Sequence, residues 1–214
     1  MEKKFELTGN LVINAFGIKL FQIKCTKSFK YANKGDLGGY VEKEDNLSQS
    51  GDAWVYGDAQ VYGNARVSGN ARVYGNARVY GDARVYGNAW VSGNAQVSGN
   101  AWVSGNAQVS GDALVYGDAW VYGNAWVSGN AQVYGDARVE NDHMHCGFDC
   151  FGSCNRHTHA YKTKGNKVEI TCGCFRGSLE EFEKKVEETH KGTIYEKQYK
   201  AIINLIKIKF GIDG

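Results

Sequence analysis

The stretch from Gly51 to Glu140 reads GDAWVY GDAQVY GNARVS GNARVY GNARVY GDARVY GNAWVS GNAQVS GNAWVS GNAQVS GDALVY GDAWVY GNAWVS GNAQVY GDARVE. These fifteen hexads follow one another without an insertion. Each contains Gly, then Asn or Asp, then Ala, a variable residue and Val, and all but the last end in Tyr or Ser. A period this regular predicts one small structural unit stacked repeatedly on itself.

The chemistry of the hexad predicts a short strand followed by a corner. Ala and Val stand two residues apart, so in a strand they face the same side, while the variable residue between them faces the other. Gly followed by Asn or Asp is typical of turns, because Gly tolerates positive φ and the short side chains bond their own backbone. A chain that turns after every hexad closes as a triangular prism of three hexads per coil. Five coils at the usual strand spacing make a column roughly 24 Å tall.

The pattern V-[YS]-G-[ND]-A-x resembles the hexapeptide repeat of left-handed parallel β-helix proteins, with Val in the aliphatic position and Ala in the small one. The left-handed sense is implied by this resemblance alone, because the usual crossover rule favours the right-handed form. The expected fold is therefore mainly β, a left-handed parallel β-helix of about five coils of three hexads. It carries an N-terminal β hairpin and cap (1–50), the solenoid (51–140) and a small Cys/His-containing α+β domain (141–214).

The flanking segments are expected to close the two ends of the stack, whose edge strands are otherwise free to pair with other chains. Residues 11–25 alternate as a hairpin around Gly17, and the lead-in G-D-L-G-G-Y-V-E (35–42) with N-L-S-Q (46–49) follows. This lead-in resembles that of uncharacterised hexapeptide-repeat proteins of bacteria and phages, which implies a phage or prophage product. After the solenoid we expect strands at 161–163 and 168–174, a helix that starts with a capping box at Ser178 and ends at Gly192, and a second helix over 195–209.

Counting by threes places the variable residues in three vertical columns, one on each face of the prism. Face one carries Trp54, Arg72, Trp90, Gln108 and Trp126; face two carries Gln60, Arg78, Gln96, Leu114 and Gln132; face three carries Arg66, Arg84, Trp102, Trp120 and Arg138. All five tryptophans thus lie on faces one and three, and Arg72 is expected within cation–π reach of both Trp54 and Trp90.

Two interpretations of these columns stay open: ladders that stiffen the solenoid, or surfaces that bind a partner. Exposed aromatic and arginine clusters are enriched at interfaces. The candidate binding residues are therefore Trp54, Arg72, Trp90 and Trp126 on face one with Arg66, Arg84, Trp102 and Trp120 on face three.

Composition excludes several classes of partner. The net charge is +2, which is not the footprint of a basic nucleic-acid-binding domain, and Asp82, Asp118 and Asp136 share the side of Arg66 and Arg84. No stretch approaches the roughly 20 apolar residues of a membrane span, and no apolar signal core follows Met1. We therefore expect neither nucleic-acid nor membrane binding. The expected location is cytoplasmic, in the host cytosol if the gene is phage-borne, with reduced cysteines unless they bind metal.

A segment rich in cysteine and histidine follows the solenoid. Residues 141–176 hold five of the six cysteines and four of the five histidines, and Cys172, Cys174 and the later His190 are further residues of interest. Thiolate and imidazole ligands suit zinc. The first candidates for a zinc site are Cys146, Cys150, Cys154, His157 and His159. The x3 spacing of the cysteines lacks the two-residue knuckle of strong zinc motifs, so free thiols remain the alternative.

The regularity of the hexads bears on catalysis. Acyltransferases with hexapeptide repeats, the best-known enzymes of the resembled fold, place a His general base on a coil and extrude a loop at a subunit boundary. The fifteen hexads contain no His and no loop. We therefore expect a non-enzymatic binding or scaffold protein, a homotrimer like many such solenoids, which engages a host protein or small ligand through solenoid faces or inter-subunit pockets. In a phage setting it would counter a host defence; the alternative is a divergent hexapeptide-repeat acyltransferase.

Overall fold

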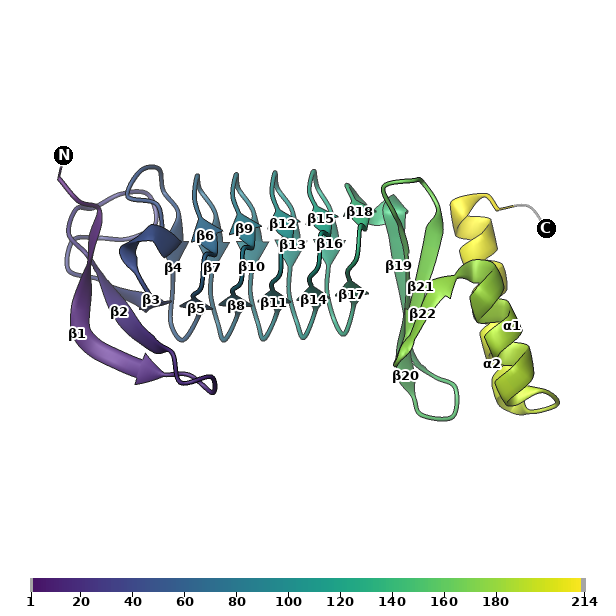
Figure 1. The fold of residues 1–214 in the computed structure, drawn as a ribbon. Coiled ribbons are helices and arrows are strands. Elements are labelled where there is room, and N and C mark those ends of the chain that lie inside the picture. Colours follow the sequence, from purple (N-terminus) through teal and green to yellow (C-terminus); the bar gives the residue numbers. More distant parts are fainter. Residues whose placement is uncertain (1, 213–214) are drawn as a thin grey trace.

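The computed structural model describes residues 2–212. A long column of stacked coils carries a β hairpin at its N-terminal end and a four-stranded sheet with two helices at its C-terminal end (Figure 1). This arrangement confirms the expected mainly β fold, a β-solenoid with an N-terminal strand region and a small C-terminal part. The left-handed sense of the coil stays a prediction from the resemblance. Neither helix within residues 2–212 is long and apolar enough to cross a membrane.

Each hexad forms one two-residue strand that starts at the variable residue and ends at Val. Face one is built from β4 (Trp54–Val55), β7 (Arg72–Val73), β10 (Trp90–Val91), β13 (Gln108–Val109) and β16 (Trp126–Val127). Face two contains β5 (Gln60–Val61), β8 (Arg78–Val79), β11 (Gln96–Val97), β14 (Leu114–Val115) and β17 (Gln132–Val133). Face three contains β6 (Arg66–Val67), β9 (Arg84–Val85), β12 (Trp102–Val103), β15 (Trp120–Val121) and β18 (Arg138–Val139). The neighbours along each sheet are parallel and one coil apart, which confirms the three columns obtained by counting.

The interior of the prism is filled by the Ala and Val of every hexad, which are buried along its whole length. Each strand bonds the next coil through its backbone, as in Trp90 N–H to Ala107 C=O at 2.9 Å. At the corners the glycines have positive φ, +72° at Gly87, and a Cβ there would lie 3.0 Å from the backbone N of Gly105. Glycine is therefore required both by its backbone conformation and by the close approach of the coils.

A second ladder runs along the corners through side-chain amides. From Asn64 to Asn106, the Nδ2 of each hexad asparagine donates to the Oδ1 of the residue one coil further on, over 3.0 Å from Asn70 to Asn88 and 3.1 Å from Asn88 to Asn106. Where an aspartate follows, as in Asn64 to Asp82 at 3.1 Å, the carboxylate accepts the same bond. The Asn-or-Asp position thus links the coils as well as turning the chain.

The N-terminal region continues the solenoid. The strands β1 (Phe5–Ile13), β2 (Lys19–Cys25) and β3 (Leu37–Val41) are antiparallel to one another, and β3 then pairs in parallel with β5. After the short helix η1 (Glu44–Asn46), Leu47 forms a parallel bridge with Val67. The lead-in therefore supplies faces two and three of a partial further coil, so that the solenoid has about six turns in all.

The first full coil has one alanine carbonyl in each of its three hexads that points toward the N-terminal region. Each receives a different donor: Lys4 Nζ to Ala53 O at 2.9 Å, Tyr40 N–H to Ala59 O at 2.9 Å, and Asn46 Nδ2 to Ala65 O at 2.9 Å. Lys4 also donates to Gly51 O at 3.2 Å, and its burial lowers the pKa of its ammonium group to about 8. A buried cation thus replaces one strand of the missing coil.

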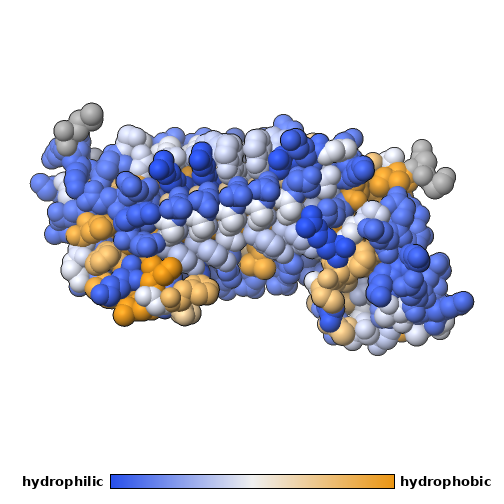
Figure 2. Space-filling view, in the orientation of Figure 1, coloured by the Kyte–Doolittle hydropathy of each residue, from blue (hydrophilic) through white to orange (hydrophobic). Residues whose placement is uncertain are grey.

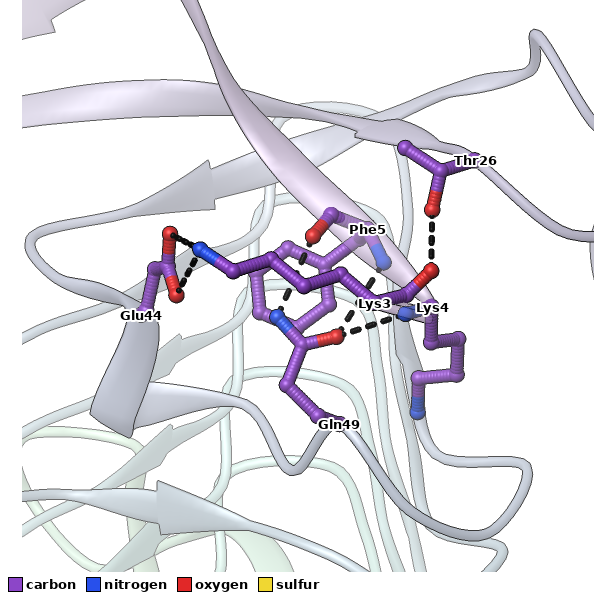
Figure 3. Close-up of polar contacts among 6 residues, drawn as sticks. All are labelled: Lys3, Lys4, Phe5, Thr26, Glu44 and Gln49. Atoms are coloured by element: carbon purple, nitrogen blue, oxygen red, sulfur yellow. Dashed lines mark hydrogen bonds and ion pairs between the residues drawn. The ribbon is translucent and has the colours of Figure 1, made fainter. Parts of the chain in front are cut away.

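The amide of Gln49 holds the chain beside Lys4 (Figure 3). Its Oε1 accepts from the backbone N–H of Lys4 at 2.7 Å and of Phe5 at 3.2 Å, and its Nε2 donates to Phe5 C=O at 3.1 Å. The neighbouring Lys3 points to the surface instead and pairs with Glu44 at 2.7 Å. Gln49 therefore fixes the direction in which Lys4 enters the core.

The C-terminal unit is an antiparallel sheet backed by two helices. After η2 (Asp142–Met144) the strands are β19 (His145–Phe151), β20 (Arg156–Lys162), β21 (Val168–Cys172) and β22 (Phe175–Ser178), followed by α1 (Leu179–His190) and α2 (Ile194–Phe210). Both helices were expected, and α1 begins with the predicted capping box of Ser178 and Glu181. The strands β19 and β22 were not expected; β19 occupies much of the Cys/His segment.

The two faces of this sheet have different neighbours. One packs against the helices in an apolar core that includes Ala160, Ile170 and Phe182. The other meets the last coil, where His159 Nδ1 lies 3.0 Å from Gln132 O. On the face shown in Figure 2, the main apolar patch lies over the N-terminal hairpin; the coils are pale to hydrophilic, and the C-terminal unit is largely hydrophilic with smaller apolar patches.

Candidate functional site

Face one is closed at its N-terminal end. Trp54 is only 1% exposed, because Phe5 and Phe29 pack edge-on against its ring at 6.4 and 5.4 Å. The prediction of Trp54 as a surface binding residue is therefore wrong. The N-terminal region, whose packing cannot be read from the repeat, covers it.

Arg72 lies between two aromatic rings, as expected, but one of them is different. Its guanidinium carbon is 3.8 Å from the ring centroid of Trp90, which confirms that predicted contact, and 4.8 Å from the ring centroid of Tyr31. Tyr31 takes the place expected for Trp54. Since Arg72 and Trp90 are half-buried, they contribute more to stiffening this part of face one than to an open surface.

The remaining candidate on face one is Trp126. It is 55% exposed and its Nε1 donates to Ser110 Oγ at 3.3 Å. Gln108 lies between it and Trp90 in the sheet, so the tryptophans of face one form no continuous column.

Face three carries an uninterrupted strip that we call the Arg–Trp strip: Arg66, Arg84, Trp102, Trp120 and Arg138. The indole rings of Trp102 and Trp120 are stacked, 4.8 Å apart at an angle of 4°. Arg84 covers one end of this stack at 5.2 Å from Trp102, and Arg138 covers the other at 4.4 Å from Trp120. Because the ring faces are covered, the strip presents ring edges and guanidinium N–H groups to solvent.

The N-terminal half of the strip lines a hollow. Its walls are Arg66, Ser68, Arg84, Tyr86 and Trp102, around a volume of about 420 Å³. Two cations, two hydroxyls and an indole edge thus face one space. The hydroxyl residues at the sixth hexad position, Ser68 and Tyr86, were not predicted as site residues; the Tyr/Ser alternation at that position was the available signal.

The two arginines of the hollow have no carboxylate partner. They are opposite one another in adjacent strands, both exposed, and within residues 2–212 neither forms an ion pair. The nearby Asp82 instead accepts from Asn64 in the corner ladder. Two like charges one strand spacing apart repel each other, so the hollow favours an anion.

Arg138 is arranged differently from the other arginines of the strip. Its Nη1 donates to Asp118 O and to Ala137 O, each at 2.9 Å. This end of the strip is therefore committed to the backbone, and the open donors are those of Arg66 and Arg84.

The structure does not bring the five residues predicted as zinc ligands together around one point. Cys146 is opposite Ala160 in the sheet and packs in the helix-facing core, whereas His159 projects to the other face, against the last coil. Strand alternation is the reason, since neighbouring positions of a strand point to opposite faces. Within residues 2–212 no group of three or more Cys, His, Asp or Glu side chains is placed to hold a metal ion.

Of the other three residues of that set, His157 lies beside His159, with their ring centroids 5.6 Å apart. Cys150 and Cys154 are exposed at the loop end of the sheet, and His157 pairs with Asp149, its Nδ1 2.7 Å from the Asp149 Oδ1. The geometry therefore favours the free-thiol alternative over the zinc site.

Histidines line the contact between the C-terminal sheet and the solenoid. His159 is fully buried, and burial, with the charge of His145 next, lowers the pKa of its imidazole to about 3. A backbone carbonyl only accepts, so the contact with Gln132 O requires a proton on His159 Nδ1. His159 Nε2, 3.0 Å from His145 Nδ1, is then the acceptor from His145. This chain of neutral imidazoles was not anticipated and fastens the C-terminal unit to the last coil.

The fold and the strip define a β-solenoid with an exposed surface of arginine and tryptophan. Six segments of the chain match the family model described as "YdcK Beta solenoid repeat", at residues 59–75, 71–83, 77–93, 95–108, 107–123 and 131–143. The chain is thus similar to that family within its solenoid. No curated protein matches the chain. Similarity of this kind supports the fold only, so function has to be inferred from the residues on the surface.

Proposed function

We propose that this protein is a non-enzymatic binding scaffold, in which face three holds an acidic segment of a partner protein. The observation that carries the proposal is the hollow at Arg66 and Arg84, where two exposed arginines lie side by side without an ion pair within residues 2–212. Carboxylates are natural partners for guanidinium groups, which bind them with two parallel hydrogen bonds.

The rest of the hollow supports a peptide over a small inorganic anion. Trp102 and Tyr86 meet edge to face at 6.2 Å and offer an aromatic wall beside the cations. An acidic residue at the arginines and an apolar residue against this wall would both be satisfied at once. Aromatic and arginine side chains are the usual energetic centres of protein interfaces.

The regular coils support a rigid platform more than a catalyst. The strands recur every six residues from Trp54 to Val139 without a protruding loop, and no coil residue is a histidine. Nothing on the solenoid therefore supports the acyltransferase alternative. Asp82, Asp118 and Asp136 along the same edge disfavour a phosphate backbone, which makes nucleic acid the weaker partner.

The proposal is tested with a yeast-displayed library of random peptides of about twelve residues, selected on the purified protein. We expect the selected peptides to carry two or more Asp or Glu residues beside an aromatic or aliphatic residue. Binding of one such synthetic peptide, measured by fluorescence anisotropy, should weaken at least about tenfold in the double variant Arg66→Gln, Arg84→Gln. It should also weaken as salt is raised.

The matched control is Arg78→Gln, because Arg78 is also exposed but lies on face two. Its affinity should stay within about twofold of that of the unmodified protein. Unchanged binding in the double variant would overturn the proposal, as would selection of peptides without acidic residues. A single-stranded DNA of about twenty nucleotides that binds more tightly than the peptide would make nucleic acid the partner.

The assembly and biological setting also stay proposals. We propose a homotrimer that leaves face three free to engage a host protein, in a phage setting where such binding would counter a defence. Static light scattering gives the mass directly, and three times the 23.5 kDa chain is the expected value. A monomeric mass would remove the trimer without affecting the role of Arg66 and Arg84.

A further inference from the structure

A pocket with a volume of about 310 Å³ opens on the helix side of the C-terminal unit and shares no lining residue with the Arg–Trp strip. Its apolar floor includes Phe175, Phe182, Val186 and Tyr199. The rings of Phe182 and Tyr199 meet edge to face at 5.6 Å, so this floor is firmly packed. The pocket is therefore part of the fold and not a gap between mobile segments.

Three of the six cysteines line this one pocket. Cys172 is buried, with its sulfur 3.3 Å from Thr158 Oγ1 and 3.7 Å from Tyr199 Oη. Cys154 and Cys174 are exposed at the mouth. Two accessible thiols therefore stand over an apolar cavity that has a third sulfur in its wall.

The mouth of the pocket is positively charged. The cations Arg156 and Lys185 line it, and no Asp or Glu does. Arg156 forms no ion pair within residues 2–212, and its guanidinium lies so close to Gly173 that a Cβ there would be 2.4 Å from Nη1. Gly173 has φ +59°, a backbone conformation that favours glycine, and precedes Cys174 in the turn, so the guanidinium packs against the backbone next to this thiol.

The electrostatics agree with this geometry. The pKa of the Arg156 guanidinium is raised, chiefly by the neighbouring Cys154 and then by Cys174. The other cation of the rim, Lys185, lies 3.9 Å from Glu188 on the exposed surface of α1, a contact too long and too exposed to neutralise it. The rim thus retains positive charge for an incoming ligand.

We propose that this pocket is a thiol–disulfide exchange site for anionic low-molecular-weight disulfides, with Cys174 as the attacking thiol. The Cys174 thiolate attacks one sulfur of the disulfide, a bond forms between the two sulfurs, and the disulfide bond breaks. The leaving thiolate carries away the electron pair and takes up the proton that Cys174 lost. Cys174 is oxidised to a mixed disulfide and the departing thiol is the reduced product, so the ligand itself is the oxidant.

Each part of the pocket has a role in this reaction. Arg156 and Lys185 attract carboxylates of the disulfide, and the floor of Phe175 and Phe182 takes its apolar part. Attack requires access, which Cys154 and Cys174 have and Cys172 lacks. Cys174 is assigned as the attacking thiol because it follows Gly173, against which the Arg156 guanidinium packs. Cys150 is also exposed but does not line the pocket, so it provides an internal comparison within the same chain.

The test uses two disulfide reagents of opposite character on the full chain. One is the dianion 5,5′-dithiobis(2-nitrobenzoate) and the other is neutral 4,4′-dithiodipyridine, and peptide mass spectrometry gives the rate at each cysteine. We expect the dianion to modify Cys174 about tenfold faster than Cys150, and the neutral reagent to discriminate less than about threefold. Arg156→Gln should lower the preference of the dianion for Cys174 over Cys150 to the level seen with the neutral reagent. The control Lys191→Gln changes an exposed lysine outside this pocket and should leave that preference unchanged.

Circular dichroism and the melting temperature establish that each variant is folded. The neutral reagent serves as a second control, because its rate at Cys174 depends on access and on the thiolate fraction but not on attraction between the reagent and the charged rim. Equal Cys174 to Cys150 ratios for the two reagents would overturn the proposal. So would an anionic preference that survives Arg156→Gln. Modification of Cys154 in place of Cys174 would overturn the assignment of the attacking thiol.

Discussion

The two ends of the solenoid meet the same physical requirement with different chemistry. At the N-terminal end the free carbonyls of the first coil are satisfied by a strand that continues the coil, by an asparagine and by the buried ammonium of Lys4. At the C-terminal end a separately packed sheet covers the last coil, with the carboxylate of Asp142 accepting from Trp126 N–H at 2.8 Å and His159 bonding Gln132 O. One end is an extension of the repeat and the other is a docked unit.

Because the two ends are closed by different interactions, we expect them to tolerate different perturbations. The N-terminal closure packs against the first coil at close range, so we expect the stability of that end to depend most on the size of the side chains there. The C-terminal closure relies on neutral imidazoles, so we expect the stability of that end to depend most on their protonation.

The largest contrast is between Gly51 and Gly129, corner glycines of the first and last coils. Both have positive φ, +69° and +63°, but a Cβ on Gly51 would lie 2.5 Å from Gly69 O whereas a Cβ on Gly129 meets nothing within 4 Å. Gly51→Ala should therefore pay both backbone strain and a clash, about 4 kcal/mol, and Gly129→Ala only the strain, about 1 kcal/mol. Amide hydrogen exchange reports the local free energy of opening and therefore measures the loss of stability in each variant.

The two substitutions are each other's control, because the change and the backbone conformation are matched. Equal losses at the two positions would contradict the view that contact with the next coil makes the N-terminal corner intolerant. A larger loss at Gly129 would reverse the comparison.

The second prediction concerns the buried Lys4. Lys4→Met keeps the length and apolar packing of the side chain but removes both hydrogen bonds to the carbonyls of Gly51 and Ala53. The variant should lose about 3 kcal/mol of local stability, because bonds from a charged donor are worth more than neutral ones and the carbonyls would be left unpaired. Hydrogen exchange in residues 51–61 is the measurement, and a loss below about 0.5 kcal/mol would show that Lys4 is not the closing element.

The third prediction tests the other end by pH. The pKa of His159 is lowered from 6.5 to about 3 in the folded protein, so the unfolded chain takes up a proton first as the pH falls. The stabilising contribution is therefore complete above pH 6.5 and declines between pH 6.5 and pH 3, by about 2 kcal/mol at pH 5. Urea unfolding of the C-terminal unit at pH 7 and pH 5, compared with His159→Asn, measures this term.

The exposed His143 supplies the control for that titration. His143→Gln should retain the full loss of stability between pH 7 and pH 5, whereas His159→Asn should retain little of it. An equal pH dependence in all three proteins would show that the histidine contact does not govern the C-terminal closure.

How much of each end can be predicted from the sequence depends on how far apart in the chain the contacting residues are. The period of the hexads determines which residues are one coil apart, so the contact of Arg72 with Trp90 was predictable from counting alone. The burial of Trp54 was not, because Phe5 and Phe29 reach it from a segment outside the repeat. The placement of Cys146 away from His159 depends on the alternation of β19 and β20, a hairpin whose mixed composition has no clear strand signal.

The smallest expected effect is at Lys3, the neighbour of Lys4. Lys3 and Lys4 look equivalent in the sequence, but Lys3 pairs at the surface with Glu44, where the two side chains are 58% and 41% exposed. Lys3→Met should therefore change local stability by no more than about 0.5 kcal/mol, since water and salt already screen such a pair. Hydrogen exchange of residues 51–61 in Lys3→Met and Lys4→Met, read side by side, separates the loss of a surface charge from the loss of a buried donor. A comparable loss in the two variants would mean that positive charge near the first coil matters, and not the hydrogen bonds that close it.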